Sequence, residues 1–472
     1  MASPVNITDE PLSPSGRLFL QPEMNTIIHC ALGVKNSMDV DAIKSAIKNS
    51  ILAKHPRFCS LLVHDKNGLE HWRRTEVDFD KHIIFVGNPT ATITTAKEAE
   101  KMVNDYIADL SVSSPLSMDK PLWEIHIMWE PRCAIFRLHH AIGDGIELMS
   151  MLVGSCRKVE DPEAIPSLDT VNGKNWRGSG RKWKDCRGIL MGLLKMVLLN
   201  LVFCLELVLR SLWVGDRKTV ISGGDGVELW PRKVATAHFL MEDMKVVKKA
   251  IANATINDVL LGVISAGLST YLEHRSPTSL QENQRLTGVA MVNLREQLGL
   301  QDLTKMLESN PKSRRGNKFG IILLPIYYNK GVEPLQHVIR AKATIDRKKQ
   351  TFEAHLSYKV ADFAISLLGS KFVSYFNYRI HCNSSFVISN VVGPKEEATI
   401  AANPITYLRA NTTSLPQALA MHMVSYAGRA DMQIVVAKDI IPDPQFLAKC
   451  FEDSLLDMKE AAVATLTSLG GS

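Results

Sequence analysis

Hydrophobic and polar positions change period repeatedly along this chain of 472 residues, and one stretch organises the pattern. Residues 121–145 read PLWEIHIMWEPRCAIFRLHHAIGDG. The apolar runs 123–129 and 133–139 flank a Glu-Pro-Arg break, which predicts two strands joined by a tight connection. Residues 146–152 are apolar at helical spacing. Asp144 and Gly145 are therefore expected where a strand passes into a helix.

The rest of the first third mixes hairpins with amphipathic helices. Helical periodicity extends over 39–53 and 97–110. The apolar runs 58–63 and 69–73 predict a hairpin, because the Asn-Gly between them suits a tight turn. This alternation predicts an α+β domain over residues 1–160.

Residues 160–184 are rich in Pro, Gly, Ser, Asn and basic side chains, which predicts a linker. A second domain is expected from residue 233 to 472, after a linker region 161–232. Its predicted strands are 234–240, 286–292, 319–326, 385–389 and 432–436, and its predicted helices are 242–252, 256–272, 338–349 and 444–462.

The most hydrophobic stretch, 189–214, lies within the linker region. A helix of this length would be about 39 Å long, against the ~30 Å hydrocarbon core of a bilayer. Its three charges, Lys195, Glu206 and Arg210, fall on one narrow stripe of a helix. The pattern alone leaves three possibilities: a transmembrane span, a helix in the plane of a membrane surface, and a helix buried by the protein.

Composition narrows the class of partner. A net charge of +6, from 55 basic and 49 acidic residues, is too small to indicate nucleic acid. It is compatible with an anionic membrane surface or a phosphorylated cofactor. The eight cysteines are scattered without paired spacing, which predicts reduced thiols in a cytosol-facing protein. The polar, proline-rich amino terminus predicts no secretory signal.

The histidine pair is the strongest candidate for chemistry. Neighbouring strand residues face opposite sides, so His139 and His140 should have different roles. An imidazole at a strand end is suited to act as a general base, although a lone histidine on an apolar strand is usually a satisfied core residue. Asp144 could return through a turn as an orienting group. A metal site is disfavoured, because opposite-facing neighbours make poor joint ligands and no further Cys/His cluster has zinc spacing.

Two further motifs could either contribute to a binding site or have a purely structural role. In NDVLLG (257–262), Thr255 is expected to cap a helix with Asp258 as its partner, which leaves Asn257 free to bond across a domain junction. In SNVVGP (389–394), a strand is expected to stop at Asn390, with exposed amides that could bind a carbonyl oxygen. Ordinary capping and an ordinary strand end are the alternatives. The basic run Lys312, Arg314, Arg315 and Lys318 is either a solvated loop or a contact for phosphates.

His-His-x-x-x-Asp-Gly resembles the motif of acyl-CoA-dependent acyltransferases and of peptide-synthetase condensation domains. Other segments narrow the resemblance to the plant branch of the wax ester synthase/diacylglycerol acyltransferase family, over nearly the whole chain. These segments are EPLSP (10–14), RLF (17–19), KHPRF (54–58), PLW (121–123), NDVLLG (257–262), MVNLR (291–295) and SNVVGP (389–394).

The resemblance implies an α+β fold of two acyltransferase-like, condensation-domain-like domains flanking a substrate tunnel. It implies acyl transfer from acyl-CoA, as co-substrate, to a fatty alcohol, with diacylglycerol as a further acceptor and without a permanently bound cofactor. His140 would be the general base. His139 and Asp144 would hold its loop and the imidazole, Asp144 by pairing with an unidentified arginine, and Gly145 would allow the close turn. From the second domain, Asn257, Asp258, Ser389, Asn390 and Gly393 would shape the substrate cleft.

The resemblance also bears on the helix 189–214. Basic residues before it favour a cytosolic first half by charge. A span would nevertheless separate motifs that the resemblance places around one site. We therefore expect a helix lying in the membrane interface, with Trp183 and Trp213 at its ends. The expected location is the endoplasmic reticulum, another endomembrane or the plasma membrane, with both domains facing the cytosol.

Two rivals remain at this level. The first is a soluble acyltransferase of the BAHD type, a family that also carries an Asp-Phe-Gly-Trp-Gly motif, which this chain lacks. The second is a catalytically silent lipid-binding protein with the same fold.

Overall fold

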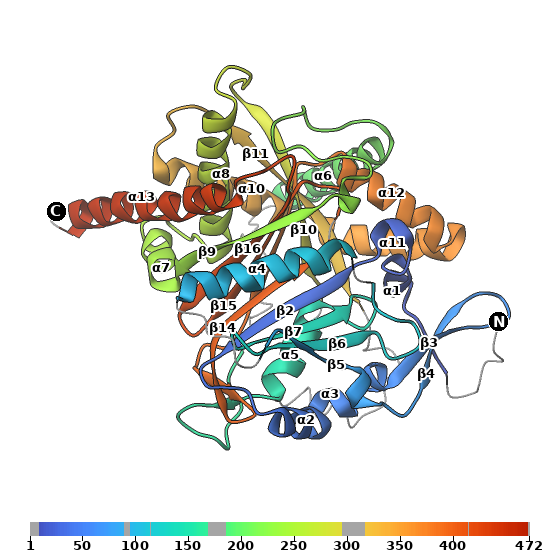
Figure 1. The fold of residues 1–472 in the computed structure, drawn as a ribbon. Helices are drawn as coiled ribbons and strands as arrows, with labels where there is room; N and C mark the ends of the chain where they lie inside the picture. Colours follow the sequence, from blue (N-terminus) through green and yellow to red (C-terminus); the bar gives the residue numbers. More distant parts are fainter. Residues whose placement is uncertain are drawn as a thin grey trace.

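The computed structural model describes residues 9–88, 95–113, 115–168, 186–294, 317–413 and 415–470. Two mixed sheets carry the fold, and helices cover them (Figure 1). The seven-stranded sheet has the order β5-β6-β7-β2-β14-β13-β8. Its strands are β2 (Ile27–Val34), β5 (Ile83–Val86), β6 (Trp123–Met128), β7 (Cys133–His139), β8 (Arg157–Lys158), β13 (Ala398–Ile400) and β14 (Asn403–Thr412).

The six-stranded sheet has the order β11-β10-β12-β15-β16-β9 and comes entirely from the second half of the chain. Its strands are β9 (Arg232–Leu240), β10 (Gln284–Asn293), β11 (Phe319–Tyr328), β12 (Phe386–Val392), β15 (Leu419–Tyr426) and β16 (Arg429–Ala437). A small third sheet joins β1 (Glu10–Pro11), β4 (Glu70–Arg74) and β3 (Ser60–His64).

The described helices surround these sheets. They are α1 (Pro14–Leu18), α2 (Val40–Asn49), α3 (Ile51–Lys54), α4 (Ala96–Ser113), α5 (Gly145–Gly154), α6 (Cys186–Leu212), α7 (Met241–Lys249), α8 (Ile256–Arg275), α10 (Pro334–Lys349), α11 (Glu353–Leu368), α12 (Ser370–Cys382) and α13 (Pro444–Gly470). The α+β fold class is confirmed. The helix expected over 39–53 is interrupted at Ser50, where the backbone turns extended between α2 and α3.

The two halves of the chain share one sheet. Strand β14 pairs antiparallel with β2, so that Arg409 lies opposite Ala31. Strands β13 and β14 thus complete the sheet of the first half, although the boundary at residue 233 assigns them to the second. Arg409 also binds Asp431 of β16 at 2.7 Å, which ties β14 to the six-stranded sheet. The halves are therefore interlocked, because the second half contributes two strands to the sheet of the first.

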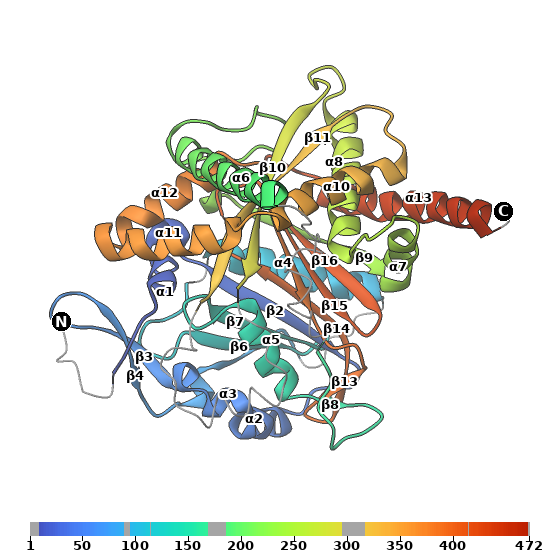
Figure 2. The ribbon, with the colours of Figure 1, turned by 180° about the vertical axis from the view of Figure 1, so that it is seen from behind.

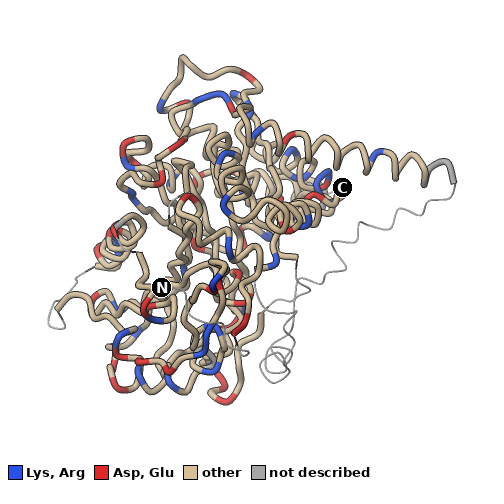
Figure 3. The backbone as a smooth tube through the Cα atoms, turned by 90° about the vertical axis from the view of Figure 1, so that its right-hand side faces the viewer, with Lys and Arg blue, Asp and Glu red and all other residues tan. Residues whose placement is uncertain are grey.

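Helix α6 leaves the body of the protein with few charged positions along its projecting half (Figure 3). The 23 residues Leu190–Leu212 are long and apolar enough to cross a membrane, and only 6% of their most apolar window is buried. This excludes the third possibility considered above, a helix buried by the protein. Trp183 lies outside the described residues, whereas Trp213 is 71% exposed.

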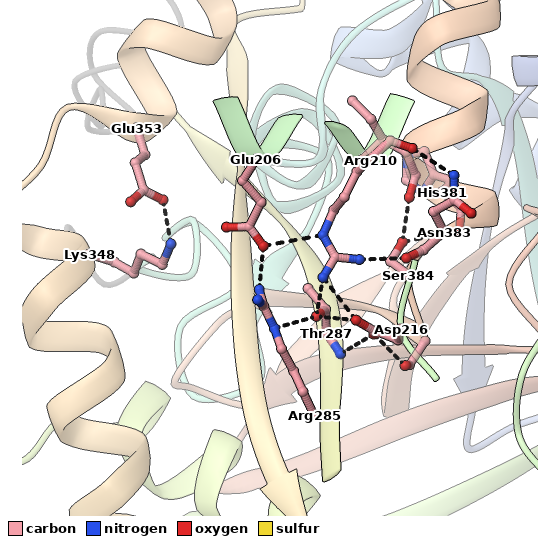
Figure 4. Close-up of polar contacts among 12 residues, drawn as sticks. Glu206, Arg210, Asp216, Arg285, Thr287, Lys348, Glu353, His381, Asn383 and Ser384 are labelled. Atoms are coloured by element: carbon pink, nitrogen blue, oxygen red, sulfur yellow. Dashed lines mark hydrogen bonds and ion pairs between the residues drawn. The ribbon is translucent and has the colours of Figure 1, made fainter. Parts of the chain in front are cut away.

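The polar stripe on α6 faces the protein at its carboxyl-terminal end (Figure 4). Arg210 is 2% exposed and donates to Asp216 at 2.8 Å, to Thr287 of β10 at 2.8 Å and to Glu206 at 3.2 Å. Glu206 also pairs with Arg285 of β10. Glu206 and Arg210 are consequently paired within the protein, whereas Leu201, Val202, Leu205 and Val208 are more than half exposed.

Candidate active site

The histidine pair lies at the end of β7, and its two rings bind different partners, as the strand alternation predicts. The Nε2 atom of His139 lies 3.0 Å from Oδ1 of Asn25, and its Nδ1 accepts the Ala141 amide at 3.1 Å. Burial and the neighbouring His140 lower the pKa of His139 to about 3. His139 thus holds the turn after the strand as a neutral ring.

The His140 ring binds Asn317, which lies two residues before the start of β11. Nδ1 of His140 is 3.2 Å from the Asn317 side-chain oxygen, and Nδ2 of Asn317 donates to the His140 carbonyl at 2.7 Å. An amide oxygen can only accept, so Nδ1 carries the proton and Nε2 has the free lone pair. This tautomer is the one that a general base acting through Nε2 requires.

Aromatic rings enclose the same imidazole. Phe19 stacks on His140 with 4.0 Å between ring centroids, and Phe319 lies 6.0 Å away. Burial lowers the pKa of His140 to about 4, against the opposing effects of its own backbone and of Asn317. The ring is therefore neutral near pH 7 and able to accept a proton.

Asp144 caps helix α5. One carboxylate oxygen accepts the Glu147 amide at 3.1 Å, and the other lies 3.4 Å from the Lys318 amide. It thereby ties the loop after His140 to the segment that carries Asn317. An arginine partner for Asp144 remains a prediction.

The close turn that Gly145 was expected to allow is not found. The φ of Gly145 lies outside the left-handed region, so no close turn demands glycine there. An added Cβ would meet only a methyl group of Val391, at 3.7 Å. This end of α5 lies at ordinary contact distance from Val391 of β12, which places the histidine motif next to SNVVGP.

The amino-terminal motifs support this loop. Arg57 of KHPRF is 2% exposed and donates to the Ile142 carbonyl and to Glu10 of EPLSP, both at 2.9 Å. Ser15 donates to the Asn317 carbonyl at 2.7 Å. Segments far apart in the chain therefore converge on the His140 loop.

NDVLLG begins helix α8, as predicted. Asp258 forms the capping box with Thr255, accepting its amide at 2.6 Å, and is fully buried. This is the ordinary capping alternative for Asp258. Gly262 is required by packing, because an added Cβ would lie 2.8 Å from the side chain and 2.9 Å from Cα of Val338 in α10.

Asn257 and Asn390 meet across two elements. Nδ2 of Asn390 donates to Oδ1 of Asn257 at 2.8 Å, which joins NDVLLG to SNVVGP. The expected stop of the strand at Asn390 is wrong: β12 continues to Val392, because it pairs in parallel with β15 as far as Ser425. The Gly393 amide donates to the Ser425 carbonyl at 3.0 Å and is not free for a ligand.

Ser389 lies beside a residue that the sequence did not single out. His422 of β15 is in register with Ser389 and is 6% exposed. Burial and the charge of a protonated His140 lower the pKa of His422 to about 4. The six-stranded sheet thus contributes a second neutral imidazole in the neighbourhood of His140.

Asn317 was also missed by sequence reasoning, which considered only the basic residues around it. Its one signal is a short amide side chain shortly before an apolar strand, and many loops share that feature. Lys312, Arg314, Arg315 and Arg295 of MVNLR lie outside the described residues. No group of three His, Cys, Asp or Glu side chains in the described ranges could hold a metal ion.

Comparison with known proteins places this site in a family. The wax ester synthase/diacylglycerol acyltransferase catalytic domain matches residues 25–220, and the WS/DGAT C-terminal domain matches residues 315–459. Wax ester synthase/diacylglycerol acyltransferase 4 of Arabidopsis thaliana is 34% identical over 98% of this chain and 92% of its own length. Wax ester synthase/diacylglycerol acyltransferase 11 of the same plant is also 34% identical, over 97% of this chain and 96% of its own length.

Solved structures share the fold at low identity. The wax ester synthase/diacylglycerol acyltransferase of Marinobacter aquaeolei VT8 superposes with a TM-score of 0.60 at 16% identity, covering 96% of this chain and 99% of that one. The first condensation domain of the calcium-dependent antibiotic synthetase has a TM-score of 0.59 at 12% identity, with 97% of each chain covered. The full-length similarity to the plant proteins is decisive, and the chain belongs to the wax ester synthase/diacylglycerol acyltransferase family of acyltransferases.

Proposed function

We propose that the enzyme transfers a long-chain acyl group from acyl-CoA to a fatty alcohol, and to diacylglycerol as a second acceptor, with His140 as the general base. The observation that carries this proposal is the pairing of His140 with Asn317, which leaves Nε2 of a neutral ring to accept a proton. Family membership supplies the substrate classes.

In the proposed reaction, Nε2 of His140 removes the hydroxyl proton as the alcohol oxygen attacks the thioester carbonyl carbon. The tetrahedral intermediate collapses, the carbon–sulfur bond breaks, and the CoA thiolate recovers the proton from Nε2. No acyl-enzyme is needed, because the thioester is already activated and a positioned alcohol can attack directly. Asn317 stabilises the transient imidazolium, since its side-chain oxygen accepts from Nδ1.

The other site residues are proposed to position these groups. His139 and Asp144 hold the loop through the contacts described above, and Gly145 begins α5 beside Val391 of β12. From the other half, Asn257 and Asn390 link the two motifs, while Ser389 lies on the β12–β15 pair beside His422. Asp258 and Gly393 act through helix capping and backbone approach.

We also propose that α6 lies in the plane of an endomembrane, with both sheets on its cytosolic side. Arg210 anchors the carboxyl-terminal end of α6 to β10. The side chains of α6 that point away from the protein, between Leu190 and Leu212, are exposed. A helix in the plane of the membrane leaves both sheets on one side of the bilayer. A transmembrane helix would place the segments before and after α6 on opposite sides, although they lead to halves of the chain that share one sheet. The endoplasmic reticulum is the proposed membrane, and no nucleic-acid partner or permanently bound cofactor is proposed.

The catalytic assignment is tested with purified protein, labelled acyl-CoA and either a fatty alcohol or diacylglycerol. His140→Ala should reduce ester formation by about 10²–10⁴-fold. His64→Ala, at an exposed strand end, is the matched control and should retain full activity. Retention of most activity by His140→Ala would overturn the assignment.

A further inference from the structure

Helices α11 and α12 expose large apolar side chains that the protein core does not use. On α11, Phe363 and Leu367 are one helical turn apart and are 69% and 68% exposed. On α12, Phe372 and Tyr375 are 48% and 53% exposed. Contiguous apolar surface of this kind marks an interaction site and not an ordinary protein surface.

The surface is continuous with that of α6. The three helices pack against one another and gather on one side of the molecule, away from α13 (Figure 2). The Asn200 side chain of α6 accepts the backbone amide of Phe352, where α11 begins, at 3.1 Å. Together, α6, α11 and α12 form what we call the three-helix platform.

The charged side chains of the platform that are exposed all have the same sign, whereas Asp362 of α11 is half-buried. The exposed ones, in the described part of the helices, are the lysines Lys195, Lys359 and Lys371. The acidic side chains are buried or half-buried, and Glu206 and Glu353 pair with cations of the protein. Apolar side chains with interspersed lysines match an anionic lipid surface, in which the lysine stems reach the head groups.

The platform also touches the catalytic loop through α1. Helix α1 packs against both α11 and α12, and the Gln21 side chain just beyond it donates to Ser370 at 3.3 Å. Phe19, at the carboxyl end of α1, stacks on His140. A lipid surface on the platform would therefore lie next to the element that covers the catalytic imidazole.

We infer that α11 and α12, together with α6, dock the enzyme onto the head-group region of an anionic bilayer, so that the lipid acceptor reaches His140 past α1. The inference rests on the proposed membrane association of α6 and extends the docking surface to α11 and α12. A bilayer is favoured over a second copy of this chain, because copies would bring like-charged lysines together.

Vesicle binding tests the inference with the full chain. Phe363→Asp/Leu367→Asp should weaken binding to phosphatidylserine-containing vesicles by about tenfold or more, because it removes apolar area and adds negative charge. Leu456→Asp/Val463→Asp on α13, where the side chains are 49% and 48% exposed, is the matched control. The control should bind like the wild type.

The two proposals fail in different ways. In detergent micelles with a short-chain alcohol, Phe363→Asp/Leu367→Asp should keep its transfer activity, whereas His140→Ala should lose it in every format. If Phe363→Asp/Leu367→Asp binds vesicles as tightly as the wild type, the docking role is overturned. It is also overturned if the wild-type protein forms a dimer in the absence of vesicles and this dimer does not bind vesicles.

A direct contact measurement covers the case in which the double variant does not fold. An environment-sensitive fluorophore on Leu367→Cys should shift to the blue when vesicles are added, after subtraction of the signal from native thiols. The same label on Leu456→Cys should not shift. A label at residue 367 that stays in water would overturn the inference.

Discussion

The side chain of Asn317 holds both the ring and the backbone of His140. Its oxygen lies 3.2 Å from Nδ1, and its nitrogen donates to the carbonyl at 2.7 Å. One amide therefore sets the tautomer and the position of the imidazole at once. Asn317 is a positioning residue, since it acts through His140.

Asn317→Ala should lower kcat/KM by about tenfold, which corresponds to about 1.4 kcal/mol of transition-state stabilisation. Loss of orientation should appear mainly in kcat. The hydrogen bond that the His140 ring donates to the Asn317 side-chain oxygen raises the pKa of His140, so its removal should move the acid limb of the pH profile to lower pH. A purely structural role would leave that limb in place.

The wild-type pH profile follows from the same ring. Burial lowers the pKa of His140 to about 4, so the neutral, proton-accepting form persists well below the usual value for histidine. The acid-side loss of kcat/KM should accordingly occur between about pH 5 and pH 3, and not near pH 6.5. An acid limb centred near 6.5 would show that the free enzyme holds His140 in a more polar environment.

Arg57→Lys should reduce activity by about tenfold, because a lysine cannot bind the Ile142 carbonyl and Glu10 in the geometry of a guanidinium. The comparison is Arg74→Lys, whose exposed side chain should be replaceable without loss. Steady-state kinetics and thermal unfolding of both variants separate an effect on the loop from one on overall stability. Equal behaviour of the two variants would contradict the role given to Arg57.

Arg210→Met should reduce the free energy of unfolding by about 3–5 kcal/mol, because it leaves the buried Asp216 without its cation. Lys195→Met on the same helix removes an exposed charge and should change stability by less than about 0.5 kcal/mol. Chemical denaturation measures both. A small effect at Arg210 would show that the anchoring of α6 depends on packing alone.

Gly393→Ala should destabilise the protein by about 1–3 kcal/mol, because the added Cβ would lie 2.3 Å from the Ser425 carbonyl oxygen. Gly145→Ala provides the contrast: its Cβ would meet only Val391 at 3.7 Å, and alanine favours the helix that begins there. Thermal unfolding should therefore show a larger loss of stability for Gly393→Ala than for Gly145→Ala, although both glycines lie in sequence motifs. A stability loss at Gly145 as large as that at Gly393 would contradict the assignment.

Much of the local structure could be predicted from the sequence. Strands β6 and β7 and the capping of α8 by Thr255 and Asp258 follow from residues only a few positions apart. The different partners of His139 and His140 follow from the alternation of side chains along a strand. The end of β12 was misplaced, because parallel pairing with β15 outweighs the local turn signal of Gly393 and Pro394.

The fold class, the family and the histidine proposed as general base could be predicted from the sequence alone, because periodicity, caps and ordered motifs lie in short segments. The contact of Asn317 with His140, 177 residues away, and the pairing of β14 with β2 are visible only in the folded chain. The same is true of the contact between Arg210 and β10 and of the exposure of the apolar side of α6. Such contacts depend on the packing of the whole chain, and no local pattern encodes which distant side chain will fill a buried position.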